Sequence, residues 1–361
     1  MKIRTLTVRK VWLSGLIAVL VLSCGIFTPA TPTPGPNALQ VDYVYTSNLI
    51  TVLYPLYGSK LDDFAIVTIT NPRSTPAQVM VSTEVTSYTT KSIDTVTVAA
   101  GETLEVRQNP RLIPEVIDQL NAEKPAQFHI TVAELDNGVE KPILEDTDDT
   151  LIYGRRDFPW SIPGFTDAEV YDLMAAMVTP TDPSVEELIR NAANYTSSGT
   201  ISSGYGGHVD DDNGAVWERL AAIWEAEVDY YNLTYISTTT SFAPGTVQRI
   251  RLPFEVLDQR SGNCIETSML FASAAEAMGL EAAIIVIPGH AYMGVRTDQE
   301  NANYYFIETT LIGRATFQEA VDYASQEFKD ALPHLDAEEQ GYGWVTIADA
   351  REKGILPLPW H

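Results

Sequence analysis

One cysteine, one histidine and one glutamate in the C-terminal half of the chain have the types and the order that thiol chemistry requires. Cys264 opens a run of helix-forming residues, and His290 and Glu308 follow on two strand-like segments. A thiol nucleophile needs a base to take its proton, and the base needs an acid that fixes its tautomer and stabilises its charged form. The three residues therefore predict a nucleophile, a general base and an orienting acid.

The segment that carries the cysteine is predicted to be a helix from Cys264 to Met278. Its residues are strong helix formers, and Gly279 fits the position just beyond a helix end. The first turn of a helix carries partial positive charge and unpaired N–H groups, which favour a thiolate and can hold an oxyanion. Gln259 and Asn263 are further candidates for oxyanion donors, although either residue also fits a role in shaping the turn before the helix.

The histidine and the glutamate are predicted to lie on neighbouring antiparallel strands. Ala282–Ile287 is a continuous apolar run, His290–Val295 follows a Pro-Gly turn, and Tyr304–Thr309 returns after a polar loop. Adjacent strands of this kind can bring His290 beside Glu308. Taken singly, His290 also fits a core histidine and Glu308 a surface acid at a strand end, but the joint pattern favours a site.

Helical segments are predicted on both sides of this unit. The apolar period changes from two to a helical spacing after residues 154–164, a stretch that is predicted to be a linker between two domains. Trp217 and Trp224 have core-facing spacing and are expected to be core residues rather than site residues. The predicted helices are Asp167–Val178 with Thr166 as a cap, Pro183–Tyr195, Ala215–Tyr230 and Thr316–Leu335, and an apolar segment follows at Trp344–Pro359.

Several of these residues together resemble the transglutaminase-like superfamily, a papain-like fold with a Cys–His–Asp triad. The resemblance is carried by Arg260, Gly262 and Cys264 in an R-x-G-x-C spacing, by a helix that ends in Met-Gly-Leu, by the strand with His290, and by Glu308 two residues before a threonine. It is firm over residues 250–313 and loose over residues 167–360. It implies an α+β domain, residues 165–361, in which the helix that bears Cys264 packs on an antiparallel sheet.

The same resemblance implies that Cys264 is the nucleophile, His290 the general base and acid, and Glu308 the orienting acid. Two departures stand out. The family usually has Asp where this chain has Glu308, although Glu can perform the same role. The interval from Cys264 to His290 is 26 residues, without a long insertion, which resembles a compact prokaryotic member rather than an animal calcium-dependent transglutaminase.

The first residues of the chain are predicted to be a bacterial lipoprotein signal peptide, residues 1–23. The basic segment Lys2–Lys10 precedes the apolar run Val11–Leu22, which is too short to span a bilayer comfortably, and Ser23 and Cys24 follow. This order resembles a lipobox; the alternative is a plain secretory signal or a short anchor with an incidental cysteine. The resemblance implies an extracytoplasmic protein that acyl chains on Cys24 tether to the bacterial cell membrane.

The chain has two cysteines, so lipid on Cys24 leaves Cys264 without a disulfide partner. A lone exported thiol is prone to oxidation, which favours a functional reason to keep it, although a buried inert cysteine is the alternative. Residues 24–39 are rich in Pro and Thr and are predicted to be an extended linker that lifts the rest of the chain from the membrane.

The first half of the chain, residues 40–153, is predicted to be an all-β domain. Its segments are rich in Val, Thr and Ile, and Asp136, Asn137 and Gly138 form a hairpin-turn signal. Turn residues recur at intervals typical of an immunoglobulin-like or fibronectin-like sandwich. His129 alternates within a strand and is expected to be structural. The domain is expected to be a spacer or a binding module, and no cluster of residues identifies a ligand.

Composition and missing motifs exclude several classes of function. The formal net charge is −25, so nucleic-acid binding is not expected, because a phosphate backbone would be repelled. The acidic loop His208–Gly214 does not match a calcium loop, because Val209 and Leu220 occupy ligand positions. The sequence contains no Walker loop, dinucleotide GxGxxG or GxSxG elbow. We therefore predict no metal and no cofactor.

The sequence therefore predicts a cell-surface lipoprotein with a cysteine acyl-transfer domain that acts on amide bonds of a peptide or protein substrate. Cys264 would form a thioester and pass the acyl group to water, as a protease or deamidase does, or to another amine, as a crosslinking enzyme does. The choice of acceptor is not predicted, because it depends on the shape of the pocket. The alternative is an inactive binding or scaffold protein that uses the same fold at the membrane surface.

Overall fold

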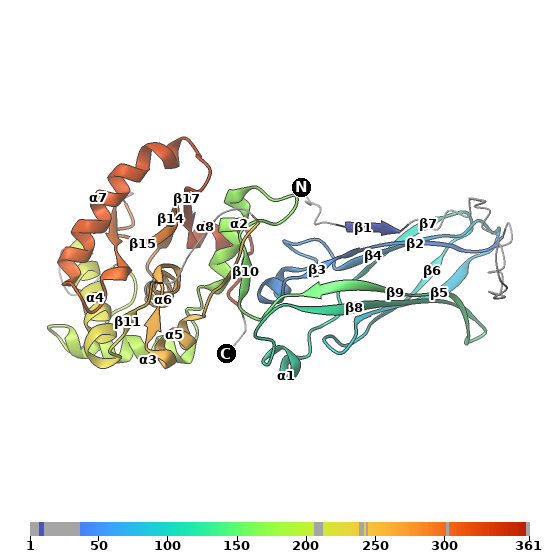
Figure 1. The fold of residues 1–361 in the computed structure, drawn as a ribbon, viewed down its shortest axis with the longest axis horizontal. Coiled ribbons are helices and arrows are strands. Elements are labelled where there is room, and N and C mark those ends of the chain that lie inside the picture. Colours follow the sequence, from blue (N-terminus) through green and yellow to red (C-terminus); the bar gives the residue numbers. More distant parts are fainter. Residues whose placement is uncertain are drawn as a thin grey trace, which may run out of the picture. The chain divides into compact units, whose positions relative to one another are not determined.

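The computed structural model describes residues 7–10, 37–205, 212–237, 242, 245–300 and 303–358. The predictions for Val11–Leu22, Cys24, the Pro/Thr-rich segment up to residue 36, the loop residues 206–211 and the end of the chain from residue 359 lie outside these residues. The described chain is mixed α+β and has several antiparallel sheets (Figure 1). No helix within the described ranges is both long and apolar enough to cross a bilayer.

The chain divides into two compact units. The first contains residues 1–49 and 57–155, and the second contains residues 50–56 and 156–361. In the first unit, aromatic side chains from two sheets form a common core: Phe128 stacks on Tyr45, with 4.7 Å between ring centroids, and meets Phe64 edge-on. The two sheets have the strand orders β1-β2-β4-β7 and β3-β9-β8-β5-β6, and every described pair except β3 with β9 is antiparallel.

The β-rich segments of residues 40–153 form strands in the structure. Asn137 and Gly138 both have positive φ, 50° and 80°, as the tight hairpin between β8 and β9 requires. His129 lies between two glutamates on the neighbouring strands, 3.6 Å from Glu84 and 3.5 Å from Glu145. The elements are β1 (Thr7–Lys10), β2 (Gln40–Thr46), β3 (Asn48–Leu49), β4 (Ala65–Thr70), β5 (Ala77–Val85), β6 (Ser92–Val98), β7 (Thr103–Gln108), α1 (Pro114–Ile117), β8 (Lys124–Asp136) and β9 (Val139–Ile152).

The second unit contains a four-stranded antiparallel sheet in the order β16-β15-β14-β17. The predicted strands are confirmed as β14 (Ala282–Ile287), β15 (His290–Arg296) and β16 (Tyr304–Ile307), with a turn at Pro288 and Gly289 between the first two. The strand β17 (Gly343–Thr346) pairs with β14 and comes from the apolar segment that the sequence left without a predicted structure.

Helix α6 (Cys264–Ala277) packs on β14 and β15. It is buried along most of its length, and alanines and serines provide many of its buried side chains. These small side chains let the helix lie close to the sheet. The helix ends where it was predicted to end, because Gly279 adopts φ 73° just after the capping residue Met278.

Helix α7 (Phe317–Asp336) packs against β16. Phe328 stacks on Phe306 with 3.9 Å between ring centroids, and Ala324 packs with Tyr292 of β15 in the same core cluster. This contact fixes α7 to the two strands that carry the histidine and lead to the glutamate. Figure 1 shows α7 beside β15 in this unit.

The remaining elements surround this core, and two differ from expectation. The predicted linker contains strand β10 and the buried side chain of Trp160, which packs on Phe158 and Phe242. The third predicted helix ends as a π-helix, Ala226–Tyr230. The other elements are the 3-10 helix Thr51–Leu56, β10 (Asp157–Pro159), α2 (Asp167–Leu173) with the 3-10 turn Met174–Met177, α3 (Pro183–Ala192) with the 3-10 turn Ala193–Tyr195, α4 (Asp212–Glu225), β11 (Thr234–Tyr235), β12 (Val247–Arg249), α5 (Pro253–Gln259), β13 (Ser261–Gly262), the 3-10 turn Thr309–Leu311 and α8 (Ile347–Glu352).

Candidate active site

The turn that leads into Cys264 depends on two backbone positions. Arg260 ends α5 in the left-handed region, with φ 53°. Gly262 leaves room for the helix that follows, because a Cβ atom there would lie 2.7 Å from Cγ2 of Thr267 and 3.2 Å from Cγ1 of Val256. The R-x-G-x-C spacing therefore has a steric basis: the glycine lets the chain pass close beside the first turns of α6.

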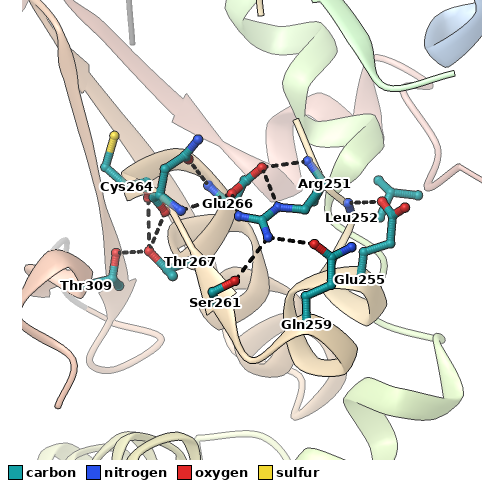
Figure 2. A network of polar contacts seen from close by, with 10 residues as sticks. Arg251, Leu252, Glu255, Gln259, Ser261, Cys264, Glu266, Thr267 and Thr309 are labelled. Atoms are coloured by element: carbon teal, nitrogen blue, oxygen red, sulfur yellow. Dashed lines mark hydrogen bonds and ion pairs between the residues drawn. The ribbon is translucent and has the colours of Figure 1, made fainter. Parts of the chain in front are cut away.

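A buried capping network fixes the N-terminus of α6. The Asn263 side chain accepts a hydrogen bond from the Glu266 backbone N–H at 3.1 Å, and the Glu266 carboxylate accepts one from the Asn263 N–H at 2.9 Å. The Arg251 guanidinium donates two hydrogen bonds to this carboxylate, at 2.6 and 3.1 Å. Figure 2 shows the Cys264 sulfur pointing away from the network, so the cap leaves the thiol available for other contacts.

The two predicted oxyanion donors take part in shaping this turn. Arg251 donates to the side-chain oxygen of Gln259 at 2.9 Å, and Figure 2 shows Gln259 on the far side of Arg251 from Cys264. The Asn263 oxygen caps the helix, and the residue is buried. Both residues therefore help to shape the turn before α6. An oxyanion role for either one stays a prediction.

Buried hydroxyl groups connect α6 to the segment that carries the glutamate. Oγ1 of Thr309 lies 2.8 Å from Oγ1 of Thr267 and 3.2 Å from Oγ of Ser268. All three residues are fully buried. Because Thr309 directly follows Glu308, these contacts fix the position of Glu308 relative to Cys264. Sequence reasoning missed this connection, since a threonine on a helix gives no sign of its partner.

The structure brings His290 and Glu308 into direct contact. Nε2 of His290 lies 2.7 Å from a carboxylate oxygen of Glu308, whose other oxygen accepts a hydrogen bond from the Thr310 N–H at 2.9 Å. Glu308 is 1% exposed and lies one residue beyond the end of β16, where it caps the turn that follows. The predicted strand Tyr304–Thr309 is therefore two residues too long, but the predicted neighbourhood of the two side chains is confirmed.

The third member of the predicted triad contacts the same histidine. The Cys264 side chain is hydrogen-bonded to His290, and Cys264 is buried. Glu308 engages Nε2, so Nδ1 is the ring nitrogen that remains for another hydrogen bond. The side chains therefore form the row Cys264, His290, Glu308, which is the geometry that a nucleophile, its base and an orienting acid need.

Electrostatics favour the charged form of this histidine. Burial alone would lower the pKa of His290, but its hydrogen bonds to Cys264 and Glu308 raise the pKa to about 10. Burial would raise the pKa of Glu308, yet the hydrogen bond and the charge of His290 hold that pKa below its usual range. At neutral pH the pair is therefore imidazolium and carboxylate.

A further acid, Glu327 of α7, completes the cluster around the histidine. Its carboxylate lies 3.8 Å from Nε2 of His290, and one ligand atom from each of His290, Glu308 and Glu327 lies within 4.8 Å of the others. Within the described part of the chain, these are the residues that could hold a metal ion. A metal ion would compete for the Nε2 nitrogen that His290 already uses in its hydrogen bond with Glu308. The cluster therefore fits a hydrogen-bonded acid–base group better than a metal site.

Tyr235 lies close to the thiol and was not predicted. It belongs to β11, which pairs in parallel with β13 so that Tyr235 is opposite Gly262. Burial raises the pKa of Tyr235, and the nearby charge of Cys264 raises it further. The Arg314 guanidinium lies over the Tyr235 ring, 5.4 Å from its centroid. The signal available in the sequence was weak, because β11 is only two residues long.

Comparisons with known proteins give a family match over part of the chain. No curated protein matches the chain. Two similar solved structures are a protein from Archaeoglobus fulgidus, with 8% identity, coverage of 36% of this chain and 90% of that chain, and a TM-score of 0.21, and a protein described as a "Putative Cysteine Protease from Cytophaga hutchinsonii", with 14% identity, coverage of 68% and 75%, and a TM-score of 0.24. Residues 252–341, which include Cys264, His290 and Glu308, match the family model described as transglutaminase-like superfamily, and this part of the chain is therefore a transglutaminase-like domain.

Proposed function

We propose that the second unit is a cysteine acyl-transfer enzyme that acts on amide bonds of peptides or proteins. The observation that carries the proposal is the hydrogen-bonded row of Cys264, His290 and Glu308 at the N-terminus of a buried helix. The capping network and the Thr309 contacts hold this row in place through groups that take no part in the reaction. A fixed nucleophile beside a charged base is what amide chemistry by a thiol requires.

The reaction begins when the Cys264 thiolate attacks the carbonyl carbon of the amide and forms a tetrahedral oxyanion. The first turn of α6 offers backbone N–H groups for its negative charge, apart from the Glu266 N–H, which donates to the Asn263 cap. His290, which already holds the thiol proton, gives it to the departing amine as the C–N bond breaks. The products of this half-reaction are a free amine and a thioester on Cys264.

The second half-reaction transfers the acyl group from Cys264 to an acceptor. His290 takes a proton from water or from an incoming amine, and the acceptor attacks the thioester carbon. The C–S bond breaks and the thiolate returns, with His290 charged again. Water gives a carboxylic acid, so the net reaction is proteolysis or deamidation, and an amine gives a new amide and a crosslink.

Glu308 is the orienting acid of this proposal. Its contact with Nε2 selects the ring orientation in which Nδ1 faces Cys264, and its charge stabilises the imidazolium. The family usually has Asp at this place. The longer side chain of Glu308 is accommodated because the residue lies beyond the strand end, where the Thr310 N–H holds its second oxygen.

The rest of the chain fits an enzyme displayed outside the cytoplasm. We propose that Cys24 carries lipid and tethers the protein to the bacterial cell membrane, because a basic segment and a short apolar run precede it. The first unit would then be an immunoglobulin-like spacer without β1 (Thr7–Lys10), which lies in the segment removed before Cys24, and the second unit a papain-like fold. Mass spectrometry of the mature N-terminal peptide tests the tether: acyl chains on Cys24 support it, and an unmodified Cys24 contradicts it.

The experiment that tests the function is mass spectrometry of surface proteins and peptides incubated with the wild type and with Cys264→Ala. Peptide cleavage, loss of ammonia from glutamine, or new crosslinks would each identify one reaction, and each must disappear in Cys264→Ala. A thioester adduct on the Cys264 peptide would show the intermediate directly. Identical product spectra for the two proteins, with no adduct, would favour the inactive scaffold instead.

A further inference from the structure

A second carboxyl group lies beside the His290–Glu308 pair, and the mechanism above does not use it. Glu327 projects from α7 and has a carboxylate oxygen 3.8 Å from Nε2 of His290, the same nitrogen that Glu308 contacts at 2.7 Å. The Glu327 side chain is 24% exposed, so it lies at the edge of the buried cluster. Helix α7 therefore brings a third acid to the site as well as packing against the sheet.

One carboxylate oxygen of Glu308 and one of Glu327 lie within 4.8 Å of each other, so ionising both groups costs free energy. Glu308 already holds the negative charge that pairs with His290, so the next charge is disfavoured. Burial, followed by the hydrogen bond and the charge of Glu308, raises the pKa of Glu327 to about 7. The buried Oε2 of Glu327 has no hydrogen-bond donor within the described chain, but a protonated Glu327 can itself donate to Glu308.

The other titratable groups around Glu327 keep their charge near neutral pH. His290 stays positive up to about pH 10. Tyr292 of β15 stays neutral, because burial and the charges of Glu327 and Glu308 raise its pKa. Asp330, on the same helix, adds a further negative charge that opposes ionisation of Glu327. Glu327 is therefore the member of this group whose charge changes between pH 6 and 8.

We propose that Glu327 is a positioning residue for the reaction of Cys264, acting through the Glu308 carboxylate and the His290 ring. In its protonated form it donates a hydrogen bond to Glu308 and holds that carboxylate against His290. In its ionised form it adds a second negative charge beside the imidazolium, which stabilises the imidazolium–thiolate pair. The inference rests on the proposed function, because Glu327 affects the thiol only through the His290–Glu308 pair.

The test is the rate at which iodoacetamide alkylates Cys264 from about pH 5 to about pH 9, followed on the Cys264 peptide by mass spectrometry. Glu327→Gln keeps the size of the side chain and is always neutral, so it mimics the protonated form. We expect equal rates for wild type and Glu327→Gln near pH 5. Above about pH 8 the wild type should be roughly three- to tenfold faster, because only it gains the second negative charge. The wild-type alkylation rate should therefore rise in a step near pH 7, and this step should be absent from Glu327→Gln.

The matched control is Asp322→Asn, which removes an exposed carboxylate from the same helix. It should keep the step near pH 7. Parallel wild-type and Glu327→Gln profiles over the whole range would overturn the proposal. A uniform loss of rate at every pH would also overturn it, because that is the effect of lost packing alone.

Three further outcomes keep the test decisive. If Glu327→Gln does not fold, Glu327→Asp replaces it: the ionisable group is then one methylene shorter, so the step should remain with a smaller height, and an unchanged height contradicts the proposal. Wild-type labelling no faster than that of the unfolded chain would contradict the proposed function itself. Fast labelling that does not depend on Glu327 would contradict only the role of this residue.

Discussion

His290 connects the buried thiol to the buried acid, and its charge is the feature on which the proposed chemistry depends. Its contact with Glu308 orients the imidazole ring, and its contact with Cys264 places the ring where it can exchange a proton with the thiol. The pKa of about 10 means that the ring keeps its proton across the physiological range. A ring that is always charged can protonate the leaving amine immediately after the thiolate attacks.

Glu227 is another buried acid in this unit, and its charge affects the stability of the fold. It lies on the π-helix Ala226–Tyr230, is 0% exposed, and neither carboxylate oxygen has a hydrogen-bond partner within the described chain. Burial raises its pKa well above the usual value. Its folded pKa therefore exceeds its unfolded value of about 4.3, so stability is full below that value and falls as pH rises through the folded pKa.

We predict that Glu227→Gln makes the fold more stable than wild type at pH 8, and that this gain shrinks toward pH 4. Between these limits the difference in unfolding free energy should change by at least about 1 kcal/mol. Urea denaturation at several pH values measures it. Asp229→Asn, an exposed acid in the same π-helix, is the control and should show no such trend. A difference that is constant with pH contradicts the buried-acid account.

At the scale of elements, the turn between α5 and α6 decides where the thiol lies. The start of α6 is fixed from three directions: Gly262 allows the close passage, Arg251 and Glu266 cap the helix, and Thr309 attaches its first turns to the segment after Glu308. None of these contacts includes the Cys264 sulfur. They position the helix end, and the helix end positions the nucleophile.

Gly262→Ala should therefore damage both stability and reactivity. Its Cβ would lie 2.7 Å from the Thr267 methyl group, which forces the turn and the first helical residues apart and costs about 1–3 kcal/mol. Alkylation of Cys264 at neutral pH should slow by roughly tenfold or more as the helix end moves.

Gly279→Ala is the matched control for this prediction. Gly279 has φ 73°, so alanine there costs about 1–2 kcal/mol through backbone strain, but its Cβ would meet only ordinary contacts at the far end of α6. Stability should fall while Cys264 alkylation stays unchanged. Equal loss of reactivity in both variants would show that general destabilisation, and not the local turn, controls the thiol.

The elements that the sequence predicted well share a local signal. The end of α6 at Gly279 and the strands β14 and β15 follow from helix formers, turn residues and a continuous apolar run. The strand β17 and the contribution of α7 to the site could not be predicted, because both depend on pairing between distant segments. The π-helix was missed because a change from α- to π-helix has no simple residue pattern.

At the scale of the whole molecule, the boundary between the two units is not a single position in the sequence. Residues 50–56 leave the first unit and join the second, so the segment predicted as a linker is not the only connection between them. Val52 and Leu53 of this segment are fully buried. The sequence could not show this, because a short apolar segment inside a β-rich half looks like another strand.

We predict that Leu53→Ala destabilises the second unit, although the residue lies far from it in sequence. The cavity left by a fully buried leucine costs about 2–5 kcal/mol. Tryptophan fluorescence in urea reports mainly this unit, because Trp160, Trp217, Trp224 and Trp344 lie in it and residues 37–49 and 57–155 of the first unit contain no tryptophan. Val81→Ala, which shortens a fully buried side chain of β5 in the first unit, should leave the fluorescence midpoint unchanged. An unchanged midpoint for Leu53→Ala would contradict this assignment.

The most direct test of the central claim is the pH dependence of Cys264 alkylation in wild type, His290→Ala and Glu308→Gln, with the urea-unfolded chain as the reference. The proposed function predicts that Cys264 of the folded wild type is alkylated faster at neutral pH than Cys264 of the unfolded chain. His290→Ala should remove this advantage, and Glu308→Gln should reduce it, because the imidazolium loses its partner. Wild-type labelling that follows the unfolded chain at every pH would contradict the claim that Cys264, His290 and Glu308 form an active thiol site.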